Sequence, residues 1–520
     1  MDRFSLFSPD KLPPKKYAWW EGWSYKEQFY PKYSHMAGYF HVYIKNPGKN
    51  ELRIEEIFLN GKTLEELRKE FEVIWWRVYP NPIPAGELCE IIVRLRYFPK
   101  NVENEFIFKT KNRDIKCKIS AVTPKIELGY IGFNHRMDKI YIYVKKNTQN
   151  KLSLSKVYLD GEDITETSKF YFRDFFHDLA VVEVSLHQPL KYGTYHFFKV
   201  ASTEGDATAS RIRVRDDFFP IGAFWFVERP EDFVKYNLNT AMHFGYAFPR
   251  EQLARLARFG YRAIAFPFLF ACGKKEKVVP FGSNFLPDIC RPYFDTVKGH
   301  KAWLCYWIFD EPDIRDALSK HIQEHIKDIG KKVGACAMPL EERQQELIKL
   351  DPYTPTFVNS DDTFSPDNRY IYAKLADIYG HSLYPYNSGR PPFWAYKDSW
   401  ICAHACAPRP YMPFLFCGQR HKLETPYKRM PEPGEDRLTM YYSIAAGSKS
   451  LMNYSIESIG HLQGPADYPS LLEGIIRTNK EIELVSPLIS IGYPAPVAVS
   501  YTHLRAHETR HDLVCRLLLE

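Results

Sequence analysis

The chain has 520 residues, of which 45% are hydrophobic and 26% are charged, a balance that is typical of a globular protein and excludes a disordered or fibrous one. Its formal net charge is only +7, and its Lys and Arg residues are dispersed, so we expect no nucleic-acid-binding surface. No stretch of about 18 apolar residues occurs, so we expect no membrane span. A chain of this length exceeds a single hydrophobic core, and about two to four domains are expected.

Residues 1–19 form an N-terminal extension that lacks the apolar segment and the small-residue cleavage site of a secretory leader. If Met1 is the natural start, this predicts a cytoplasmic protein, whereas a start further upstream would allow a secreted one. The cysteines are scattered along the chain, which argues against a disulfide framework and fits a reducing compartment.

Residues 20–216 are dense in short runs that alternate apolar and polar residues, such as YFHVYIKN and KIYIYVKK. Alternation with a period of two, broken by Pro, Gly and Asn, is typical of antiparallel strands. An Asn-Gly pair at 60–61 and an Asp-Gly pair at 160–161 follow two of these runs and indicate tight hairpin turns. We therefore predict two β-sandwiches, at residues 20–118 and 119–216.

From residue 217 the pattern changes to strands that alternate with helices. The predicted strands lie at 220–226, 240–246, 261–268, 302–313, 354–362, 375–386, 411–418 and 450–457. This series predicts a (β/α)8 TIM barrel over residues 217–490, with a doubly wound sheet as the structural alternative. A further candidate strand at 331–339 leaves the position of the fifth strand open.

In (β/α)8 barrels the reacting groups lie at the carboxyl ends of the strands. The segment YWIFDEPD is an apolar run that ends in acids, which are costly at a buried rim unless they have partners or a function. Pro312 ends the strand and is expected to restrict Glu311 to an extended conformation. Beside Asp310, the Glu311 carboxyl is expected to have a raised pKa, as a general acid for glycosidic bonds requires. Asp313 is also a good N-cap for the following helix.

Several segments resemble barrel glycoside hydrolases. WIFDEPD is similar to their acid-bearing fourth strand, LADIYGHSLYPYN to their sixth strand, and PEPGEDRLTMYYSIAAGSKSLMNYSI to the stretch from helix seven to strand eight. LLEGIIRTNKEIELVSPLIS resembles the closing helix before a C-terminal β-domain. The resemblance covers about 280 residues. It implies a glycoside hydrolase that cleaves O-glycosidic bonds of an oligo- or polysaccharide.

The chain also departs from that group. Its retaining members with an Asn-Glu pair on strand four place a nucleophilic Glu at the end of strand seven, where this chain has FLFCGQR. The adjacent Asp310 and Glu311 instead resemble glycoside hydrolase family 123, in which the substrate's own 2-acetamido group is the nucleophile. That resemblance implies that Glu311 protonates the leaving oxygen while Asp310 orients the acetamido group. A rival second carboxylate would be Asp361, Asp362 or Glu457.

Further residues at or near the ends of the predicted strands are candidates for sugar binding. They are Trp225, His243, Asn359, Tyr384, Tyr386, Gln419, Tyr454 and Glu457. Trp225 and Tyr386 are expected to stack on a sugar ring, because aromatic faces pack against its apolar face. His243, Asn359 and Gln419 are expected to hydrogen-bond sugar hydroxyls.

The C-terminal sequence HETRH matches the H-E-x-x-H pattern of zinc proteases. Its neighbours, VSYTHLRAHET, resemble a translated sequencing adapter, so we expect residues 499–520 to be a non-native artefact. Residues 491–498 would then begin a truncated C-terminal region. We expect no metal site and no cofactor.

The sequence therefore predicts a carbohydrate-cleaving enzyme with Glu311 as general acid and Asp310 as its partner. Three alternatives stay open: a non-catalytic carbohydrate-binding barrel, a retaining glycosidase whose nucleophile lies on another strand, and a barrel enzyme of another class, such as a lyase or a transferase. The sequence does not predict the sugar, the linkage, the anomeric configuration or the oligomeric state.

Overall fold

The computed structural model describes residues 39–96, 102–120, 124–176, 178–224, 230–244, 249–266, 291–318, 322, 326–363, 365–386, 390, 392–420, 430–458 and 462–494. Of the described helices, none combines the length and the hydropathy needed to cross a bilayer. The N-terminal extension 1–19 and the C-terminal segment 499–520 lie outside the described residues, and so do residues 495–498 of the segment 491–498.

Two antiparallel sandwiches precede the barrel, and each encloses its own hydrophobic core. The first pairs a sheet β1-β5-β4 with a sheet β3-β2-β6-β7. Its elements are β1 (Tyr39–Lys45), β2 (Ile54–Leu59), β3 (Lys62–Thr63), α2 (Leu64–Lys69), β4 (Val73–Tyr79), β5 (Leu88–Leu95), β6 (Glu103–Thr110) and β7 (Asp114–Ser120). Phe40 of β1 packs edge-on against Phe106 of β6, with ring centroids 5.1 Å apart, so the core joins both sheets.

The second sandwich pairs a sheet β12-β13-β9-β8 with a sheet β11-β10-β14-β15. Its elements are β8 (Ile126–Phe133), β9 (Lys139–Lys146), β10 (Leu154–Leu159), β11 (Glu162–Asp163), η5 (Thr165–Thr167), β12 (Ser168–Phe176), β13 (Leu179–Ser185), β14 (Tyr195–Ser202) and β15 (Ala207–Arg213). Both predicted hairpin turns are confirmed: Asn60 and Gly61 have φ of 52° and 85°, and Asp160 and Gly161 have φ of 52° and 92°. Two successive positive φ values define the turn that matches the twist of a hairpin.

The third unit is a closed barrel of parallel strands in the order β16-β17-β18-β19-β20-β21-β22-β24. These strands are β16 (Ile221–Phe224), β17 (Thr240–Phe244), β18 (Arg262–Phe266), β19 (Trp303–Asp310), β20 (Thr356–Ser360), β21 (Ile378–Leu383), β22 (Tyr411–Phe416) and β24 (Leu451–Tyr454). They correspond to the predicted strands, so the barrel prediction is confirmed. Closure of the sheet excludes the doubly wound alternative.

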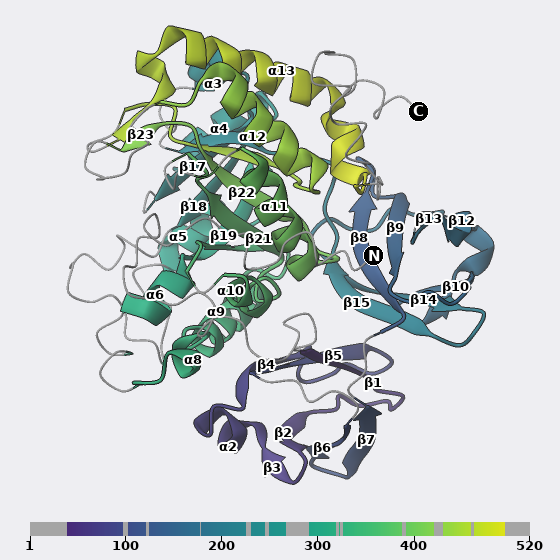
Figure 1. Ribbon diagram of the computed structural model, residues 1–520. Helices are drawn as coiled ribbons and strands as arrows, with labels where there is room; N and C mark the ends of the chain where they lie inside the picture. The colour runs from purple at the N-terminus through teal and green to yellow at the C-terminus, as the bar shows by residue number, and fades with distance from the viewer. Residues whose placement is uncertain are drawn as a thin grey trace.

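Helices surround the barrel, as Figure 1 shows. They are α3 (Pro230–Tyr236), α4 (Arg250–Arg258), α5 (Arg291–Val297), α6 (Pro312–Leu318), α8 (Ile329–Lys332), α9 (Ala337–Leu350), α10 (Asp367–Tyr372), α11 (Phe393–Cys406), α12 (Pro433–Ala445), η6 (Pro465–Asp467) and α13 (Pro469–Ile491). A short ribbon of β23 (Gln419–Arg420) and β25 (Leu462–Gln463) lies outside the barrel sheet.

The prediction of a candidate strand at 331–339 is wrong, because this segment holds the end of α8 and the start of α9. The carboxylate of Asp316 accepts hydrogen bonds from the backbone N–H of Gly334 at 2.6 Å and of Cys336 at 2.9 Å. Gly334 also has a φ of 85°, a left-handed conformation that suits a turn. Donors that serve a buried turn cannot serve a sheet.

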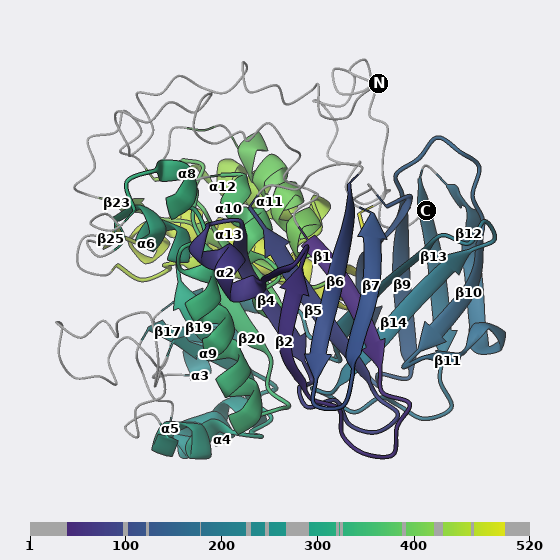
Figure 2. The same cartoon turned by 90° about the horizontal axis from the view of Figure 1, so that it is seen from below.

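The first sandwich docks on the barrel through buried polar contacts of β4 (Figure 2). Trp75 donates its indole N–H to the carbonyl of Ile371 at 3.0 Å. The Arg77 guanidinium forms a two-pronged ion pair with Glu341 of α9, and the two side chains are 5% and 2% exposed. A buried ion pair is expensive to break, because the remaining charge stays in a poorly solvated place.

We expect Arg77→Met to lower the free energy of unfolding by about 3 to 5 kcal/mol, because Glu341 would remain buried and charged. The double variant Arg77→Met with Glu341→Met should recover most of that loss. The exposed pair of Lys62 and Glu70 is the control, since Glu70→Gln should change stability by less than about 1 kcal/mol. Urea denaturation measures all of these variants, and a loss in Arg77→Met no larger than in the control would contradict the interpretation.

Candidate active site

Strand β19 carries the two acids singled out from the sequence to the carboxyl-terminal mouth of the barrel. Its residues from Trp303 to Phe309 are buried, and Asp310 at its end is half-buried. Glu311 follows with a φ of 49°, so the expected extended conformation is wrong. The ring of Pro312 disfavours the right-handed helical region for Glu311, and a left-handed residue lets the chain leave the strand and enter α6 at once. Such a backbone for a residue other than Gly is concentrated at functional sites.

A chain of hydrogen bonds from the next two strands links the two acids. Asn359 of β20 donates through Nδ2 to Oδ1 of Asp310 at 3.1 Å and to the hydroxyl of Ser382 at 3.0 Å. Ser382 of β21 in turn donates to Oε1 of Glu311 at 2.7 Å. The backbone N–H of Glu311 donates to the Asn359 carbonyl at 2.8 Å, which ties the turn to β20. Three neighbouring strands thus fix both carboxyl groups.

The environment of Asp310 keeps its proton available near neutral pH. Burial, the largest cause, raises the pKa of Asp310 to about 7, against the lowering effects of the Asn359 hydrogen bond and the charge of Arg315. A carboxyl whose pKa lies near neutral pH is suited to proton transfer or to a balance between two charge states. The raised pKa was predicted for Glu311, whereas the residue for which the structure indicates a raised pKa is its neighbour Asp310.

Two more carboxyl groups lie behind this pair. Asp313 was expected to cap α6, but it lies inside the first turn and its carboxylate accepts hydrogen bonds from other elements. The donors are the backbone N–H of Asp361, at 3.1 and 3.0 Å to the two oxygens, and Nδ2 of Asn368 at 2.6 Å. Burial is the largest cause that raises the pKa of both Asp313 and Asp361. The cap interpretation is therefore wrong, because this carboxylate holds the loop after β20.

Aromatic rings line the mouth at the ends of four strands. Tyr384, after β21, and Tyr454, at the end of β24, stack with ring centroids 6.0 Å apart. Phe416 of β22 lies 5.2 Å from the first ring and 5.9 Å from the second. Phe224 of β16 meets Tyr454 edge-on at 4.7 Å. Tyr384 and Tyr454 are half-buried, so part of this wall is accessible to a ligand.

The remaining sequence candidates lie in different settings. Tyr386 is buried, and its hydroxyl accepts a hydrogen bond from Thr439 of α12 at 3.2 Å. Gln419 is half-buried in the short ribbon with β25, and Glu457 is exposed beyond β24. His243 belongs to β17, but its side chain, like the whole of Trp225, lies outside the described residues.

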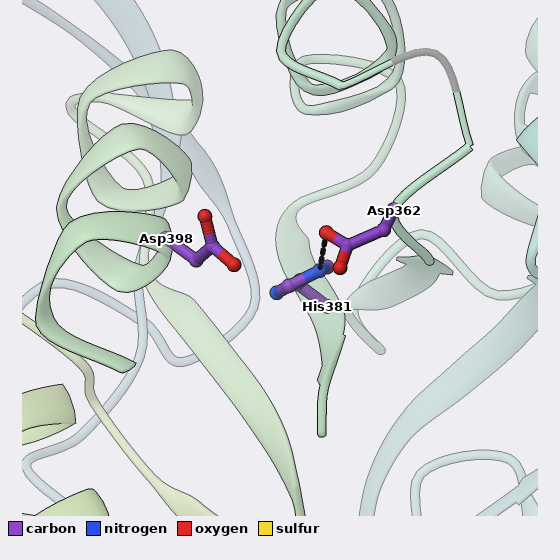
Figure 3. A group of neighbouring side chains, drawn as sticks. All are labelled: Asp362, His381 and Asp398. Carbon is purple, nitrogen blue, oxygen red and sulfur yellow. Dashed lines mark hydrogen bonds and ion pairs between the residues drawn. The ribbon is translucent and has the colours of Figure 1, made fainter. Parts of the chain in front are cut away.

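A cluster of Asp362, His381 and Asp398 has the composition of a metal site (Figure 3). Its carboxylates already have cationic partners, however. Asp362 accepts from Arg369 at 2.5 Å and pairs with Arg390, which also lies 3.6 Å from Asp398. Burial and the Arg369 charge lower the pKa of His381, whose Nε2 lies 2.8 Å from Arg369. A metal ion would have to compete with two guanidinium groups, so this donor set does not fit one, and the cluster instead braces the loop after β20.

Sequence reasoning missed two polar residues, Ser382 beside the proposed acids and Asp436 in α12. Ser382 left no signal, because a serine inside an apolar strand does not reveal which neighbour it contacts. Asp436 lies in the first turn of α12, where acids are favoured on any helix, so its burial left no sign in the sequence. In the structure it is 3% exposed, and burial raises its pKa to about 7. No cation or hydrogen-bond donor of the described residues contributes to that shift.

No protein-family model and no curated protein matches the chain. Among solved structures, it is similar to a GH2 β-galacturonidase from Eisenbergiella tayi, with 10% identity, 85% of this chain and 88% of that chain covered, and a TM-score of 0.36. It is also similar to a Bacteroides uniformis β-glucuronidase, with 11% identity, 82% of this chain and 59% of that chain covered, and a TM-score of 0.36. A β-galactosidase from Bacillus circulans sp. alkalophilus has 12% identity, with 55% of this chain and 62% of that chain covered and a TM-score of 0.40. At such scores the likeness carries no argument about the residues or the reaction of this chain.

We expect the buried carboxyl of Asp436 to make stability fall as pH rises. Its folded-state pKa of about 7 lies above the ordinary 3.8, so the folded protein keeps a proton that the unfolded chain releases. The contribution of this group to stability is therefore complete below about pH 4 and is lost between about pH 4 and pH 7, by roughly 4 kcal/mol at most. Asp436→Asn should remove this loss, and urea denaturation at several pH values measures it. Glu483→Gln, at an exposed position of α13, is the control; identical pH dependence in Asp436→Asn and wild type would contradict the prediction.

Proposed function

We propose that this chain is a glycoside hydrolase in which Glu311 is the general acid and Asp310 is its partner. The observation that carries the proposal is the pair of adjacent carboxyl groups at the end of β19, linked through Asn359 and Ser382. The carboxyl ends of barrel strands are where (β/α)8 enzymes place their chemistry. An accessible aromatic wall of Tyr384 and Tyr454 provides a surface for a sugar ring at the same mouth.

The geometry supports a division of labour between the two acids. The Ser382 hydroxyl donates to Oε1 of Glu311, so a proton on this carboxyl resides on Oε2, from which it can pass to the glycosidic oxygen. Asp310, with a pKa of about 7, is available as a carboxylate that accepts a hydrogen bond from a substrate N–H. Glu311 is thus the acid of the first step, and Asp310 orients a polar group next to the anomeric carbon.

We further propose that this polar group is the 2-acetamido group of the substrate. Its carbonyl oxygen attacks the anomeric carbon while the bond to the leaving oxygen breaks and Glu311 protonates that oxygen. Asp310 holds the amide N–H and balances the positive charge of the cyclic intermediate. Water then attacks the anomeric carbon, gives its proton to Glu311 and restores the acetamido group. Glycoside hydrolase family 123, whose Asp-Glu pair this sequence resembles, uses this scheme.

The alternative of a retaining glycosidase requires a second carboxylate about 5 Å from the acid. Within the described residues, β22 is followed by Cys417, Gly418 and Gln419, none of which is acidic. Asp361 is engaged with Asp313 and the N–H of Thr363, and Glu457 is exposed beyond β24. These placements favour a nucleophile supplied by the substrate. A carbohydrate-binding barrel without activity is the second alternative.

Hydrolysis of aryl glycosides with different leaving groups tests the acid role of Glu311. Glu311→Gln should lower kcat/KM about 10²- to 10⁴-fold for a poorly acidic leaving group, and far less for a dinitrophenyl group, which leaves without protonation. Glu473→Gln, at an exposed position of α13, is the matched control and should keep wild-type rates. Equal losses for both leaving groups would overturn the assignment. In the same assay, acetamido assistance requires turnover of N-acetylhexosaminides and not of simple hexosides, whereas hexoside turnover favours the retaining alternative.

A further inference from the structure

A cavity lies at the amino-terminal end of the barrel, opposite the mouth that holds the proposed acids. Its volume is about 380 Å³, including its opening to solvent. Its walls include Pro220, which precedes β16, Arg262, the first residue of β18, and Ile378, the first residue of β21. Tyr192 of the second sandwich and Arg215 of the connection after β15 also line it, so the cavity lies between the barrel and that sandwich.

The lining of this cavity is rich in positive charge. Arg215, Arg262 and Lys449 contribute three cations, and Asp216 is the one acid among the described lining residues. Arg262 forms an ion pair with Asp216, with Nη1 3.1 Å from Oδ1, so these two charges cancel. The hydrogen-bond acceptors of Arg215 and Lys449 among the described residues are a hydroxyl and backbone carbonyls, which are neutral. The cavity therefore has an excess of positive charge.

The two cations without an acidic partner lie around Tyr130 of β8. Lys449 Nζ lies 4.3 Å from the centroid of this ring, and the guanidinium carbon of Arg215 lies 5.8 Å from it. Arg215 also donates to the Tyr130 hydroxyl, which donates to the carbonyl of Ser490 at 2.8 Å. Burial raises the pKa of Tyr130, so its phenol stays protonated near neutral pH. Two positive charges are thus held close together by one neutral ring.

The end of α13 compensates this charge only in part. Lys449 Nζ donates to the carbonyl of Ile489 at 2.8 Å and to that of Gly492. The carboxyl end of a helix carries roughly half a negative charge, so two cations leave a surplus of about one and a half charges. Asp217, the other acid of the connection after β15, lies 3.3 Å from His135 instead. The surplus at the cavity matches a ligand with one or two negative charges.

We infer that this cavity binds a small oxyanion, such as phosphate or a carboxylate, between Arg215 and Lys449. A guanidinium group donates two parallel hydrogen bonds to the paired oxygens of such an anion. The apolar side chains of Leu304 and Met412 form another part of the wall, and charges interact more strongly where such groups exclude water. Because Arg215 follows β15 and Lys449 precedes β24, the bound anion joins the second sandwich to the barrel. This site is independent of the proposed function, since it lies at the other end of the barrel.

Titration calorimetry of the whole protein with inorganic phosphate, at an ionic strength held constant with chloride, tests the site. Wild type should bind phosphate, and Arg215→Gln should weaken this binding about 10- to 100-fold, because a charge-assisted hydrogen bond is lost. Arg136→Gln is the matched control, since Arg136 belongs to the same sandwich and its side chain is 76% exposed. A parallel titration with acetate distinguishes a phosphate site from a carboxylate site. Binding of either anion supports the proposal, and binding of neither overturns it.

A variant with the opposite effect separates specific binding from a general loss of structure. Asp216→Asn releases the Arg262 guanidinium and adds one net positive charge to the cavity, so it should bind the anion more tightly than wild type. Damage to the fold would instead weaken binding in Asp216→Asn and Arg215→Gln alike. Weaker binding in folded Asp216→Asn, or equal affinities in Arg215→Gln and Arg136→Gln, would contradict the proposal. If Asp216→Asn does not fold, the comparison of the two arginine variants decides alone.

Discussion

Two consecutive carboxyl groups at the mouth of the barrel must be held close together without being neutralised, and the rest of the site depends on how this is done. The Asn359 amide and the Ser382 hydroxyl, which donate hydrogen bonds to them, are neutral groups from the next two strands. Burial raises the pKa of Asp310 to about 7, although the Asn359 hydrogen bond and the charge of Arg315 act to lower it. His381 precedes Ser382 in β21, so its side chain points to the opposite face of the strand. There it contacts Arg369, and the charges of Arg390 and Arg369 hold the pKa of Asp362 well below its usual range. The two faces of these strands thus differ: one holds Asp310, whose proton can exchange near neutral pH, and the other holds the ion pairs of Asp362 with Arg369 and Arg390.

The N-terminal sandwiches contribute to this arrangement although they lie away from the mouth of the barrel (Figure 1). Trp75 and Arg77 bind Ile371 and Glu341, which belong to α10 and α9, the helices that precede β21 and β20. Arg213 of the second sandwich pairs with Asp377, the residue before β21, at 2.9 Å. The polar docking contacts therefore reach the connections between the strands that carry Asp310, Asn359 and Ser382. A change at this interface is expected to reach the site through these helices.

The sequence predicted the parts of the molecule that local patterns determine. Alternating strands, the Asn-Gly and Asp-Gly turns and the acids of YWIFDEPD are all readable within a few residues. Contacts between distant elements were not readable: Ser382 lies on one buried strand among several, and the pair of Arg77 and Glu341 joins residues 264 positions apart. The conformation of Glu311 was mispredicted because the rule for residues before proline excludes one region and leaves two. Asp313 was judged by its position in the helix, whereas burial decides its properties.

The central claim is that a sugar binds with its anomeric carbon beside Glu311 and its acetamido group on Asp310. A crystal structure with an N-acetylhexosamine thiazoline, which mimics the cyclic intermediate, tests this most directly. We predict that the thiazoline nitrogen lies within hydrogen-bond distance, about 2.7 to 3.2 Å, of an Asp310 oxygen, with Glu311 beside the anomeric carbon and the sugar against Tyr384 or Tyr454. A sugar bound elsewhere, or a carboxylate of another strand at the anomeric carbon, would contradict the account.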